Sequence, residues 1–381
     1  MEYLMLKEVC NINMGQSPDS SSYNENGEGI PFFQGNADFG DRYPVTRVWC
    51  DKPTKVAHSE DILISVRAPI GALNYAKEDC CIGRGLAAIT PDKDKVSLEF
   101  IYWLLKGKND ELNSKGTGST FKAISKKVLE ETLVPNIDFG KQNEYAQILE
   151  KTYSVIQMRK QELKELDNLI KARFVELFGD PKLNERGWKS GIISDYYEVK
   201  GGKRIPKGMG YTDSVTEHPY LRATDMKNGT ILDDDIHYID ESVYRHIKRY
   251  TVKSGDIYLT NVGVNLGMAG VIPDKYNGAN LTENAVKLIP KGETPIDGVF
   301  LAHYINSPGI QEYINERKMS VGVPKLAIFR IETMPLLLPP IELQQAFIDI
   351  CRQVDKSKVA VQKALDEAQL LFDSLMQQYF G

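Results

Sequence analysis

The chain has 381 residues, of which 42% are hydrophobic and 26% are charged, and its formal net charge is −5. This length suits two or three domains, no apolar run is long enough to span a membrane, and no segment is the basic block expected of a protein that grips a polyanion alone. The five cysteines lack CxxC spacing, which indicates reduced thiols in a cytoplasmic protein rather than disulfides or a zinc site.

The same order of short elements occurs twice along the chain. The first half contains a strand-like start, a Pro-aromatic strand, a Ser-x-Asp-Ile strand and a helix, in the segments 6–15, 30–34, 59–65 and 100–105. The second half repeats them in the segments 192–202, 218–222, 254–260 and 300–305. Short β-branched and aromatic strands separated by glycine and proline predict a mixed α+β globule in each half. The matching segments are unequally spaced, which predicts two copies of one fold with different loops.

Each half ends in a long amphipathic segment that matches the other without a gap. Residues 142–178 align with 344–380, and apolar residues recur at alternating steps of four and three along both segments. This heptad stripe predicts two helices, each on the order of 55–60 Å long at about 1.5 Å per residue. A lone helix would leave its stripe in water, so we expect the two to pack on each other. Pseudo-twofold symmetry between the halves favours an antiparallel pair.

The predicted fold class is therefore α+β, with two similar mixed α/β domains joined by two long antiparallel helices that form a coiled coil with pseudo-twofold symmetry. The expected boundaries are a first domain over 1–138, a central spacer helix over 139–178, a linker over 179–190, a second domain over 191–341 and a C-terminal spacer helix over 342–381. Arg159 and Arg173 fall on the heptad stripe, where we expect them to snorkel or set the register rather than contact a partner. Two similar domains a fixed span apart point to a bipartite target.

Each long helix is entered from a Leu-x-Pro segment followed by a glutamine. Pro135 precedes Gln142 in the first half, with an irregular stretch between them, and Pro339 precedes Gln344 more closely in the second. The stretch 177–188 follows the first helix. Together with the order globule, helix, globule, helix, these features make the chain resemble the DNA-specificity subunit of type I restriction–modification enzymes.

The resemblance implies a role for each part of the chain. In that family each globule is a target-recognition domain that reads one half of a split double-stranded DNA sequence, and the helices act as a ruler and dock the modification subunits. The chain is then expected to be a non-catalytic subunit without a cofactor. Its expected partners are DNA, two adenine methyltransferase subunits and ATP-dependent restriction subunits that translocate DNA.

Candidate DNA-contacting residues lie in loops beside the predicted strands. Base reading in a groove needs paired donors and acceptors, typically Arg or Lys to guanine and Asn or Gln to adenine. The first domain offers Gln34, Asn36, Arg42, Arg47, Arg67 and Arg84, and the second offers Arg222, Thr224, Lys227 and Asn261. The glycine-flanked Lys122 and Lys325 are candidates for phosphate contacts. For each of these the alternative is a solvated loop side chain, and Arg222 has Asp225 nearby as an internal ion-pair partner.

Catalytic signals are poor. The sequence has no GxxxxGK[ST] phosphate loop, no Asn-Pro-Pro-aromatic tetrad and no histidine ligand spacing, so neither catalytic residues nor a metal site is expected. Asp274 and Glu316 resemble a nuclease metal site only superficially. The alternative functions are the reader of an orphan adenine-methylation system, a coiled-coil adaptor that binds proteins, and a self-sufficient restriction enzyme, which the missing motifs argue against.

Overall fold

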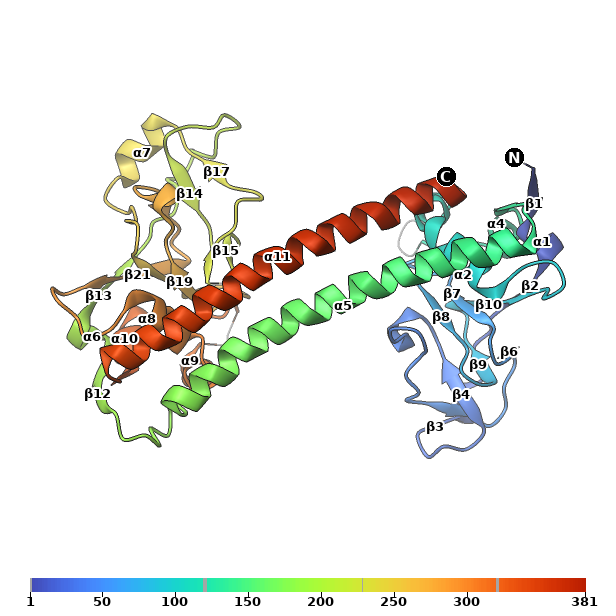
Figure 1. Ribbon diagram of the computed structural model, residues 1–381, viewed down its shortest axis with the longest axis horizontal. Coiled ribbons are helices and arrows are strands. Elements are labelled where there is room, and N and C mark those ends of the chain that lie inside the picture. Colours follow the sequence, from blue (N-terminus) through green and yellow to red (C-terminus); the bar gives the residue numbers. More distant parts are fainter. Residues whose placement is uncertain (1, 119–121, 228, 320–321) are drawn as a thin grey trace. The chain divides into compact units, whose positions relative to one another are not determined.

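The computed structural model describes residues 2–118, 122–227, 229–319 and 322–381. The chain divides into two compact units (Figure 1): unit 1 comprises Met1–Gln161 and Gln362–Gly381, and unit 2 comprises Glu162–Val361. Within the ranges given above, no helix is long and apolar enough to cross a membrane.

The described residues of unit 1 form three sheets. A two-stranded sheet pairs the first and last strands of the globule, a four-stranded sheet lies in its core, and a five-stranded sheet carries the loops considered below. In sheet order the strands are β1 (Tyr3–Met5) and β11 (Leu133–Pro135); β2 (Cys10–Met14), β10 (Leu86–Pro91), β7 (Ile62–Ser65) and β8 (Leu73–Tyr75); and β3 (Tyr23–Asn24), β5 (Trp49–Cys50), β4 (Ile30–Phe33), β9 (Cys80–Ile82) and β6 (Val56–Ala57). The short helices are α1 (Leu6–Val9), α2 (Leu98–Gly107), α3 (Asn109–Ser114) and α4 (Lys126–Glu130).

Unit 2 repeats this plan with a different periphery. In sheet order its strands are β12 (Lys189–Ile192) and β22 (Pro335–Leu338); β13 (Tyr197–Gly201), β21 (Ala285–Pro290), β18 (Ile257–Thr260) and β19 (Ala269–Val271); β17 (His237–Tyr238), β14 (Pro219–Leu221) and β20 (Asn280–Leu281); and β15 (Met226–Lys227) and β16 (Thr230–Ile231). The short helices are α6 (Ile193–Tyr196), α7 (Glu241–Ile247), α8 (Gly298–Ile305), α9 (Pro308–Arg317) and α10 (Ile328–Glu332).

The two four-stranded sheets have the same topology. The order β2-β10-β7-β8 in unit 1 matches β13-β21-β18-β19 in unit 2, and all of these pairs are antiparallel. The outer sheets differ in strand number, so the variation is confined to the peripheral strands and loops. The predicted α+β duplication with unequal loops is confirmed.

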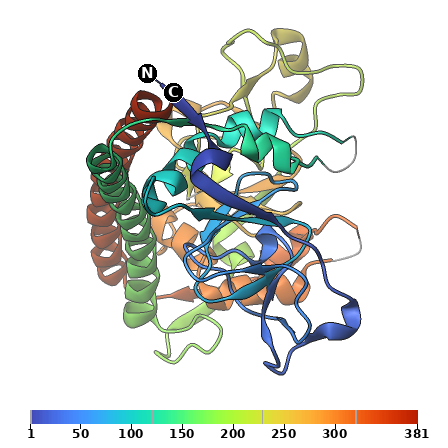
Figure 2. The ribbon, with the colours of Figure 1, turned by 90° about the vertical axis from the view of Figure 1, so that its right-hand side faces the viewer.

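The two long helices are α5 (Phe139–Phe178) and α11 (Ile341–Phe380), each of 40 residues. Figure 2 shows them in green and red. In unit 1 the ring of Tyr145, near the start of α5, stacks on that of Tyr379, near the end of α11, with 3.8 Å between centroids. In unit 2 the pairing involves the opposite ends, because Phe178 of α5 lies 5.6 Å from Phe347 of α11. The expected antiparallel pairing is confirmed.

The heptad stripe holds along α11 and changes near the end of α5. Buried residues of α11 recur at the expected positions, namely Phe347, Cys351, Val354, Val361, Leu365, Phe372 and Tyr379. In α5, Ile170 is buried as expected, but Phe174 and Phe178 follow it at steps of four. Arg173, expected on the stripe, is exposed and pairs with Glu176 at 2.7 Å. This end of the helix packs on the unit 2 core, with Phe174 stacked on Phe300 at 5.9 Å, so a broader face is buried than a two-helix seam requires.

A buried glutamine anchors each long helix to its globule. The Gln142 side chain accepts a hydrogen bond from the Ser97 backbone N–H (2.8 Å) and donates to the Ile137 and Lys95 carbonyls (3.0 and 3.3 Å). Ser97 is the N-cap of α2. Each glutamine side chain thus satisfies backbone groups that have no partner within a helix or strand.

Gln344 repeats the arrangement in unit 2. It accepts from the Asp297 N–H (2.9 Å) and donates to the Pro295 and Pro339 carbonyls (both 2.8 Å), and Asp297 is the N-cap of α8. Both glutamines are buried, and the amide group of each makes the same set of one accepted and two donated hydrogen bonds. This shared set of bonds explains why a glutamine follows each proline segment.

The end of α11 belongs to the core of unit 1. The ring of Phe372 lies 5.6 Å from that of Trp103, and the ring of Phe380 lies 5.4 Å from that of Phe100. Trp103 and Phe100 are fully buried on α2. Unit 1 is therefore built from two segments of chain that are separated by the whole of unit 2.

Candidate nucleic-acid interface

Each unit contains a parallel strand pair whose carboxyl ends lie together. In unit 1, Phe33 of β4 pairs with Ile82 of β9, and in unit 2, Leu221 of β14 pairs with Leu281 of β20. The chain leaves both strands at the same edge, because parallel strands share a direction. Loops that follow such strands are common ligand-binding positions, and several of the predicted DNA-contacting residues lie in or beside them.

Gln34 and Arg84 immediately follow this edge in unit 1. The hydroxyl of Ser17 donates to Gln34 Oε1 (3.0 Å) and accepts from the Arg84 backbone N–H (3.3 Å). Both Gln34 and Arg84 are exposed. Ser17 therefore holds the Gln34 side chain next to the loop that carries Arg84. Glutamine is suited to hydrogen bonds with adenine, and arginine is suited to hydrogen bonds with guanine.

Two glycines permit this close approach. A Cβ on Gly83 would lie 2.4 Å from Gln34 Oε1, and one on Gly85 would lie 2.4 Å from the Gln34 carbonyl oxygen. A side chain at Gly85 would push the two loops apart, because it meets backbone, whereas one at Gly83 would first displace the Gln34 side chain. Arg84, placed between these glycines, is held by backbone that is packed tightly against the glutamine loop.

Arg67 and Lys122 lie on loops that continue the same edge. The Val66 N–H donates to the Gly85 carbonyl and the Ile124 N–H donates to the Val66 carbonyl, both at 2.9 Å. Arg67 and Lys122 are exposed beside these bonds, and within the described ranges no ion pair engages Arg67 or Arg84. We call this set the first polar edge: Gln34, Arg67, Arg84 and Lys122.

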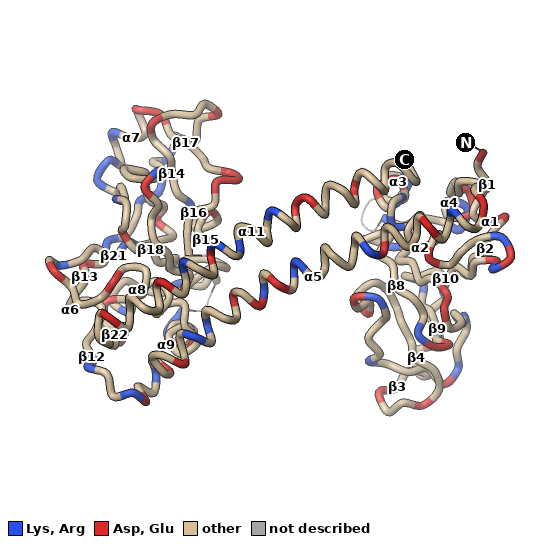
Figure 3. Tube along the Cα trace, viewed as in Figure 1, with Lys and Arg blue, Asp and Glu red and all other residues tan. Residues whose placement is uncertain are grey.

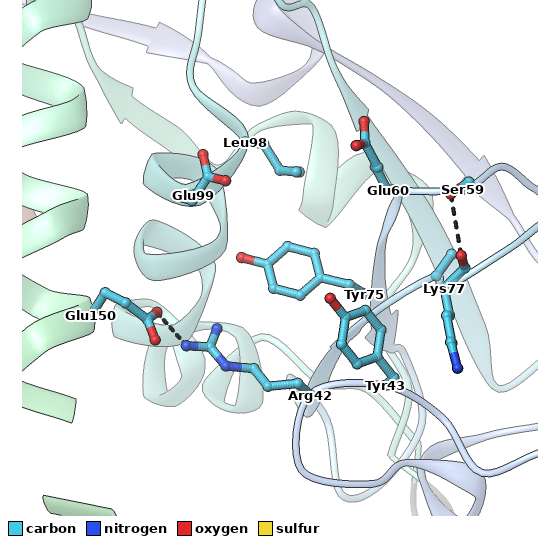
Figure 4. Close-up of a pocket in the computed structure, with 10 residues that line it drawn as sticks. Arg42, Tyr43, Ser59, Glu60, Tyr75, Lys77, Leu98, Glu99 and Glu150 are labelled. Atoms are coloured by element: carbon cyan, nitrogen blue, oxygen red, sulfur yellow. Dashed lines mark hydrogen bonds and ion pairs between the residues drawn. The ribbon is translucent and has the colours of Figure 1, made fainter. Parts of the chain in front are cut away.

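The other unit 1 candidates lie away from this set. Asn36 begins a short 3-10 turn, Asn36–Asp38, and is half-buried, while Arg47 is exposed between that turn and β5. Arg42 points toward Glu150 of α5 and forms an ion pair with it, beside Tyr75 in a cavity of about 580 Å³ (Figure 4). Its guanidinium lies 5.2 Å from the centroid of Tyr102. Arg42 thus ties its loop to α5, and we leave it out of the set proposed to read bases.

Lys106 fills the same aromatic cluster from α2. Its ammonium nitrogen lies 3.8 Å from the centroid of Tyr153 and 5.1 Å from that of Trp103. Burial, and then the neighbouring charge of Arg42, lower the pKa of Lys106 to about 8. A lysine in this state opposes folding when protonated, because the unfolded chain keeps the ordinary pKa of 10.5.

Replacing Lys106 with methionine should therefore stabilise the protein near neutral pH. Between a folded pKa of about 8 and an unfolded pKa of 10.5, the unfolded wild type binds more protons than the folded wild type, so its stability rises with pH across that window. The advantage of Lys106→Met should shrink over the same window. Urea unfolding at several pH values would measure it, with Lys151→Met, on the exposed side of α5, as the control for loss of a charge. A stability difference that does not change with pH would contradict this view of Lys106.

In unit 2, Arg222 occupies the place of Gln34 but is internally paired. Its backbone N–H donates to Asp225 Oδ2 (2.7 Å), as that of Gln34 does to Asp38, and its guanidinium binds Asp225 (2.7 Å) and Asp235 (2.9 Å). The pairing of Arg222 with Asp225, which was the alternative to a DNA contact, is present. The two carboxylates fix the guanidinium, whose pKa is raised, chiefly through the hydrogen bond from Arg222 to Asp225.

Glu283 stands where unit 1 has Arg84. Its neighbour Thr282 donates its N–H to the Leu221 carbonyl (3.0 Å), just as Gly83 does to Phe33 (2.9 Å). Glu283 forms an ion pair with Arg204. We call the following set the second polar edge: Arg204, Arg222, Thr224 and Glu283. These residues line a hollow of about 480 Å³ together with Tyr211.

The remaining unit 2 candidates are dispersed. Asn261 is only 5% exposed and donates to the Leu326 carbonyl (3.3 Å), so we leave it out of the proposed interface. Lys325 is exposed and forms a backbone bridge to Val262, which places it near the second polar edge. Lys227 is exposed at the end of β15. Ser17, Arg204 and Glu283 were not predicted, and no sequence signal marks them.

The described part of the chain offers no metal site, because no group of three or more His, Cys, Asp or Glu side chains in it could hold an ion. Asp274 accepts a hydrogen bond from Ser254, and Glu316 pairs with Lys182 at 2.9 Å and with Arg317 at 3.0 Å. Both carboxylates thus have ordinary structural partners.

Comparisons with known proteins agree with this architecture. Residues 1–168 and 185–368 match the model of the type I restriction modification DNA specificity domain. The chain is 44% identical to a putative type I restriction enzyme MjaX specificity subunit of Methanocaldococcus jannaschii, over 41% of this chain but only 37% of that relative. It is 20% identical to the type I restriction enzyme EcoBI specificity subunit of Escherichia coli, over 98% of this chain and 83% of the relative. The crystal structure of a type I restriction–modification S subunit from M. genitalium covers the whole chain and 96% of its own, with a TM-score of 0.58 at 16% identity, which is a likeness of fold.

Proposed function

The chain belongs to the type I restriction–modification DNA-specificity family, and we propose that each of its two units reads one half of a split sequence in double-stranded DNA. As a specificity subunit it is the non-catalytic component of its complex. In this proposal the first and second polar edges supply the base contacts of the two half-sites. The coiled-coil adaptor and the self-sufficient enzyme are not favoured.

The observation that carries the proposal is the duplication of the edge with different side chains. Gln34 and Arg84 in unit 1 are replaced by Arg222 and Glu283 at the same strand ends in unit 2. Arginine favours guanine and a carboxylate accepts from the cytosine amino group, whereas glutamine favours adenine. Two edges with different donors and acceptors imply two different half-sites, so the target is asymmetric.

The long helices suit the roles of spacer and docking surface. Each helix runs from one unit into the other without interruption, and basic and acidic residues are interspersed along both (Figure 3). Apolar side chains are nevertheless exposed on them, including Met158 of α5 and Val359 and Leu370 of α11. We propose that these surfaces bind two methyltransferase subunits, one for each copy of the duplicated fold, and that restriction subunits join the complex. The five cysteines are free and buried, and we place the complex in the reducing cytoplasm.

The test begins with long-read methylation sequencing of cells that express the chain with its methyltransferase partner. We expect one asymmetric bipartite sequence to be methylated. Arg84→Ala should then relax the preference at a single base pair of one half-site, because a bidentate arginine–guanine contact contributes about 1–3 kcal/mol of discrimination. Methylation rates on duplexes that each carry one base substitution would show this as a roughly 5- to 150-fold greater tolerance at that position.

Lys122→Ala is the matched control on the same edge. A phosphate contact carries no sequence information, so this change should slow methylation of all the duplexes alike. Base preference that is unaltered at every position in Arg84→Ala would remove Arg84 from the set of base readers. A methylome that is the same with and without the chain would reject the proposed function as a whole.

A further inference from the structure

The two polar edges differ in the positive charge they can offer to a DNA backbone. The first carries Arg67, Arg84 and Lys122, and the structurally matching positions in unit 2 hold Val262, Glu283 and Pro324. The match follows from equivalent backbone bonds: Ala68 N–H donates to the Lys122 carbonyl (3.0 Å), and Gly263 N–H donates to the Pro324 carbonyl (2.9 Å).

The arginines of the second polar edge are already neutralised. Arg204 pairs with Glu283, and Arg222 pairs with Asp225 and Asp235. Neutralising phosphates supplies most of the non-specific affinity of a DNA-binding protein. If unit 2 contacts DNA, Lys325, which follows Pro324, and cations outside the polar edge must therefore provide much of this charge.

A basic hollow lies next to the second polar edge. It has a volume of about 300 Å³ and is lined in part by Lys200, Arg249, Lys287 and Tyr250. Lys200 is near the end of β13, and only three residues separate it from Arg204 of the polar edge, a span of at most about 14 Å in extended chain. The backbone also links the two places, because Leu281, which lines the hollow, directly precedes Thr282, which lines the polar edge.

Two of these cations are neighbours on adjacent strands of one sheet. Lys200 and Lys287 are direct cross-strand partners of β13 and β21, an arrangement in which like charges destabilise a sheet. Lys287 is held by the Thr251 carbonyl (2.7 Å) and Asp256 (3.5 Å), and Lys200 by Glu198 (2.9 Å). Unit 1 has the uncharged pair Asn13 and Ala88 at the matching positions. The paired lysines are thus a feature of unit 2 that its fold does not require.

We propose that the hollow formed by Lys200, Arg249 and Lys287 binds the phosphate backbone of the half-site read by unit 2. This inference rests on the proposed function. Lys200 and Arg249 are exposed and carry the contact, while the less accessible Lys287 adds to the positive potential beneath them. Each of the paired lysines already has a carboxylate partner, Glu198 or Asp256, so a phosphate would be a further partner of the pair and not its only counter-charge. In this proposal the cations of unit 1 that bind DNA belong to the first polar edge itself. Those of unit 2 lie in the hollow next to the second polar edge.

The test uses the full-length chain and mixed-sequence duplex DNA, with the association constant measured by fluorescence anisotropy over a range of salt concentrations. Each phosphate contact contributes about 0.9 to the slope of log K against log salt, so the double variant Lys200→Ala/Arg249→Ala should lower that slope by about two. The conservative double variant Lys200→Arg/Arg249→Lys should restore it. Lys171→Ala/Lys189→Ala removes the same charge from exposed positions of unit 2 outside the hollow and should leave the slope unchanged.

The proposal would be overturned if the double alanine variant kept the wild-type salt slope, or if the Lys171/Lys189 control lost as much of the slope. It would also be overturned if the wild-type chain did not bind the duplex. Far-ultraviolet circular dichroism of each variant checks that unit 2 is folded. The methylated sequence tests the proposed function separately. A wild-type complex that methylates its bipartite target while the salt slope is insensitive to the hollow would retain DNA reading and reject only the backbone contact.

Discussion

Inserting four residues into α5 after Gln161 and four into α11 after Val361 should lengthen the gap between the two methylated half-sites by about two base pairs. Both helices pass from one unit to the other at these points. Four residues add about 6 Å of helix, and B-DNA rises about 3.4 Å per base pair. Because the insertions are matched in an antiparallel pair, the contacts on either side of them, such as Tyr145 with Tyr379, keep their partners. Methylation sequencing of cells that carry the variant would measure the new gap.

Two comparisons make this result specific. The same four residues inserted into the exposed segment after Asp213 should leave the gap unchanged, because that segment lies in neither helix. Insertion into α5 alone should displace the register of one helix against the other and reduce stability. A matched double insertion that methylates the original sequence at the original gap would show that the helices do not set the spacing.

Replacing Gln344 with leucine should destabilise unit 2 by about 3 kcal/mol, since a backbone group buried without its partner costs about 1–3 kcal/mol. The change removes the partner of one N–H, at Asp297, and of two carbonyls, at Pro295 and Pro339. Leucine is close to glutamine in size, so lost packing contributes little. Gln142→Leu should have a similar effect on unit 1. Urea unfolding would measure both, and limited proteolysis would identify which unit is loosened.

Gln345→Leu is the matched control for Gln344→Leu. Gln345 is the next residue of α11, and its exposed side chain bonds only to Asp349 (3.2 Å), so its loss should change the free energy of unfolding by less than about 0.5 kcal/mol. Equal effects at the two positions would mean that the buried hydrogen bonds do not matter, and that glutamine follows each proline segment for another reason.

The helices were the most predictable part of the fold, for a physical reason. Heptad spacing is a local pattern, and its gapless repetition over residues 142–178 and 344–380 left little freedom for other structures. The pattern failed only where tertiary contacts replaced the helix seam, at Phe174 and Phe178 in place of Arg173 and Leu177. Heptad spacing predicts contacts between two helices, so it does not predict packing against a third element, such as that of Phe174 on Phe300.

The candidate site was less predictable, because it depends on which loops meet. Residue type and proximity to strands include Gln34, Arg67, Arg84 and Lys122 among the candidates. The loops come together through the parallel pairing of β4 with β9 and through the backbone bonds of Val66 with Gly85 and Ile124. Arg42 satisfies the same criteria, yet its partner Glu150 lies on a helix 108 residues further along the chain. Asn261 likewise follows a strand, but it is buried and donates to the backbone carbonyl of Leu326, which lies 65 residues further along the chain. Residue type alone does not distinguish these outcomes.

The closure of unit 1 by residues 362–381 has a consequence for biosynthesis. A ribosome delivers residues 1–161 well before residues 362–381, and at about 5–20 residues per second the interval is on the order of 10–40 s. During that time Phe100 and Trp103 lack Phe380 and Phe372, so the nascent chain displays an unfinished apolar face. A translation product that stops within unit 2 would therefore expose this face to chaperones and proteases. The order of synthesis thus favours removal of truncated chains, in which neither unit is complete.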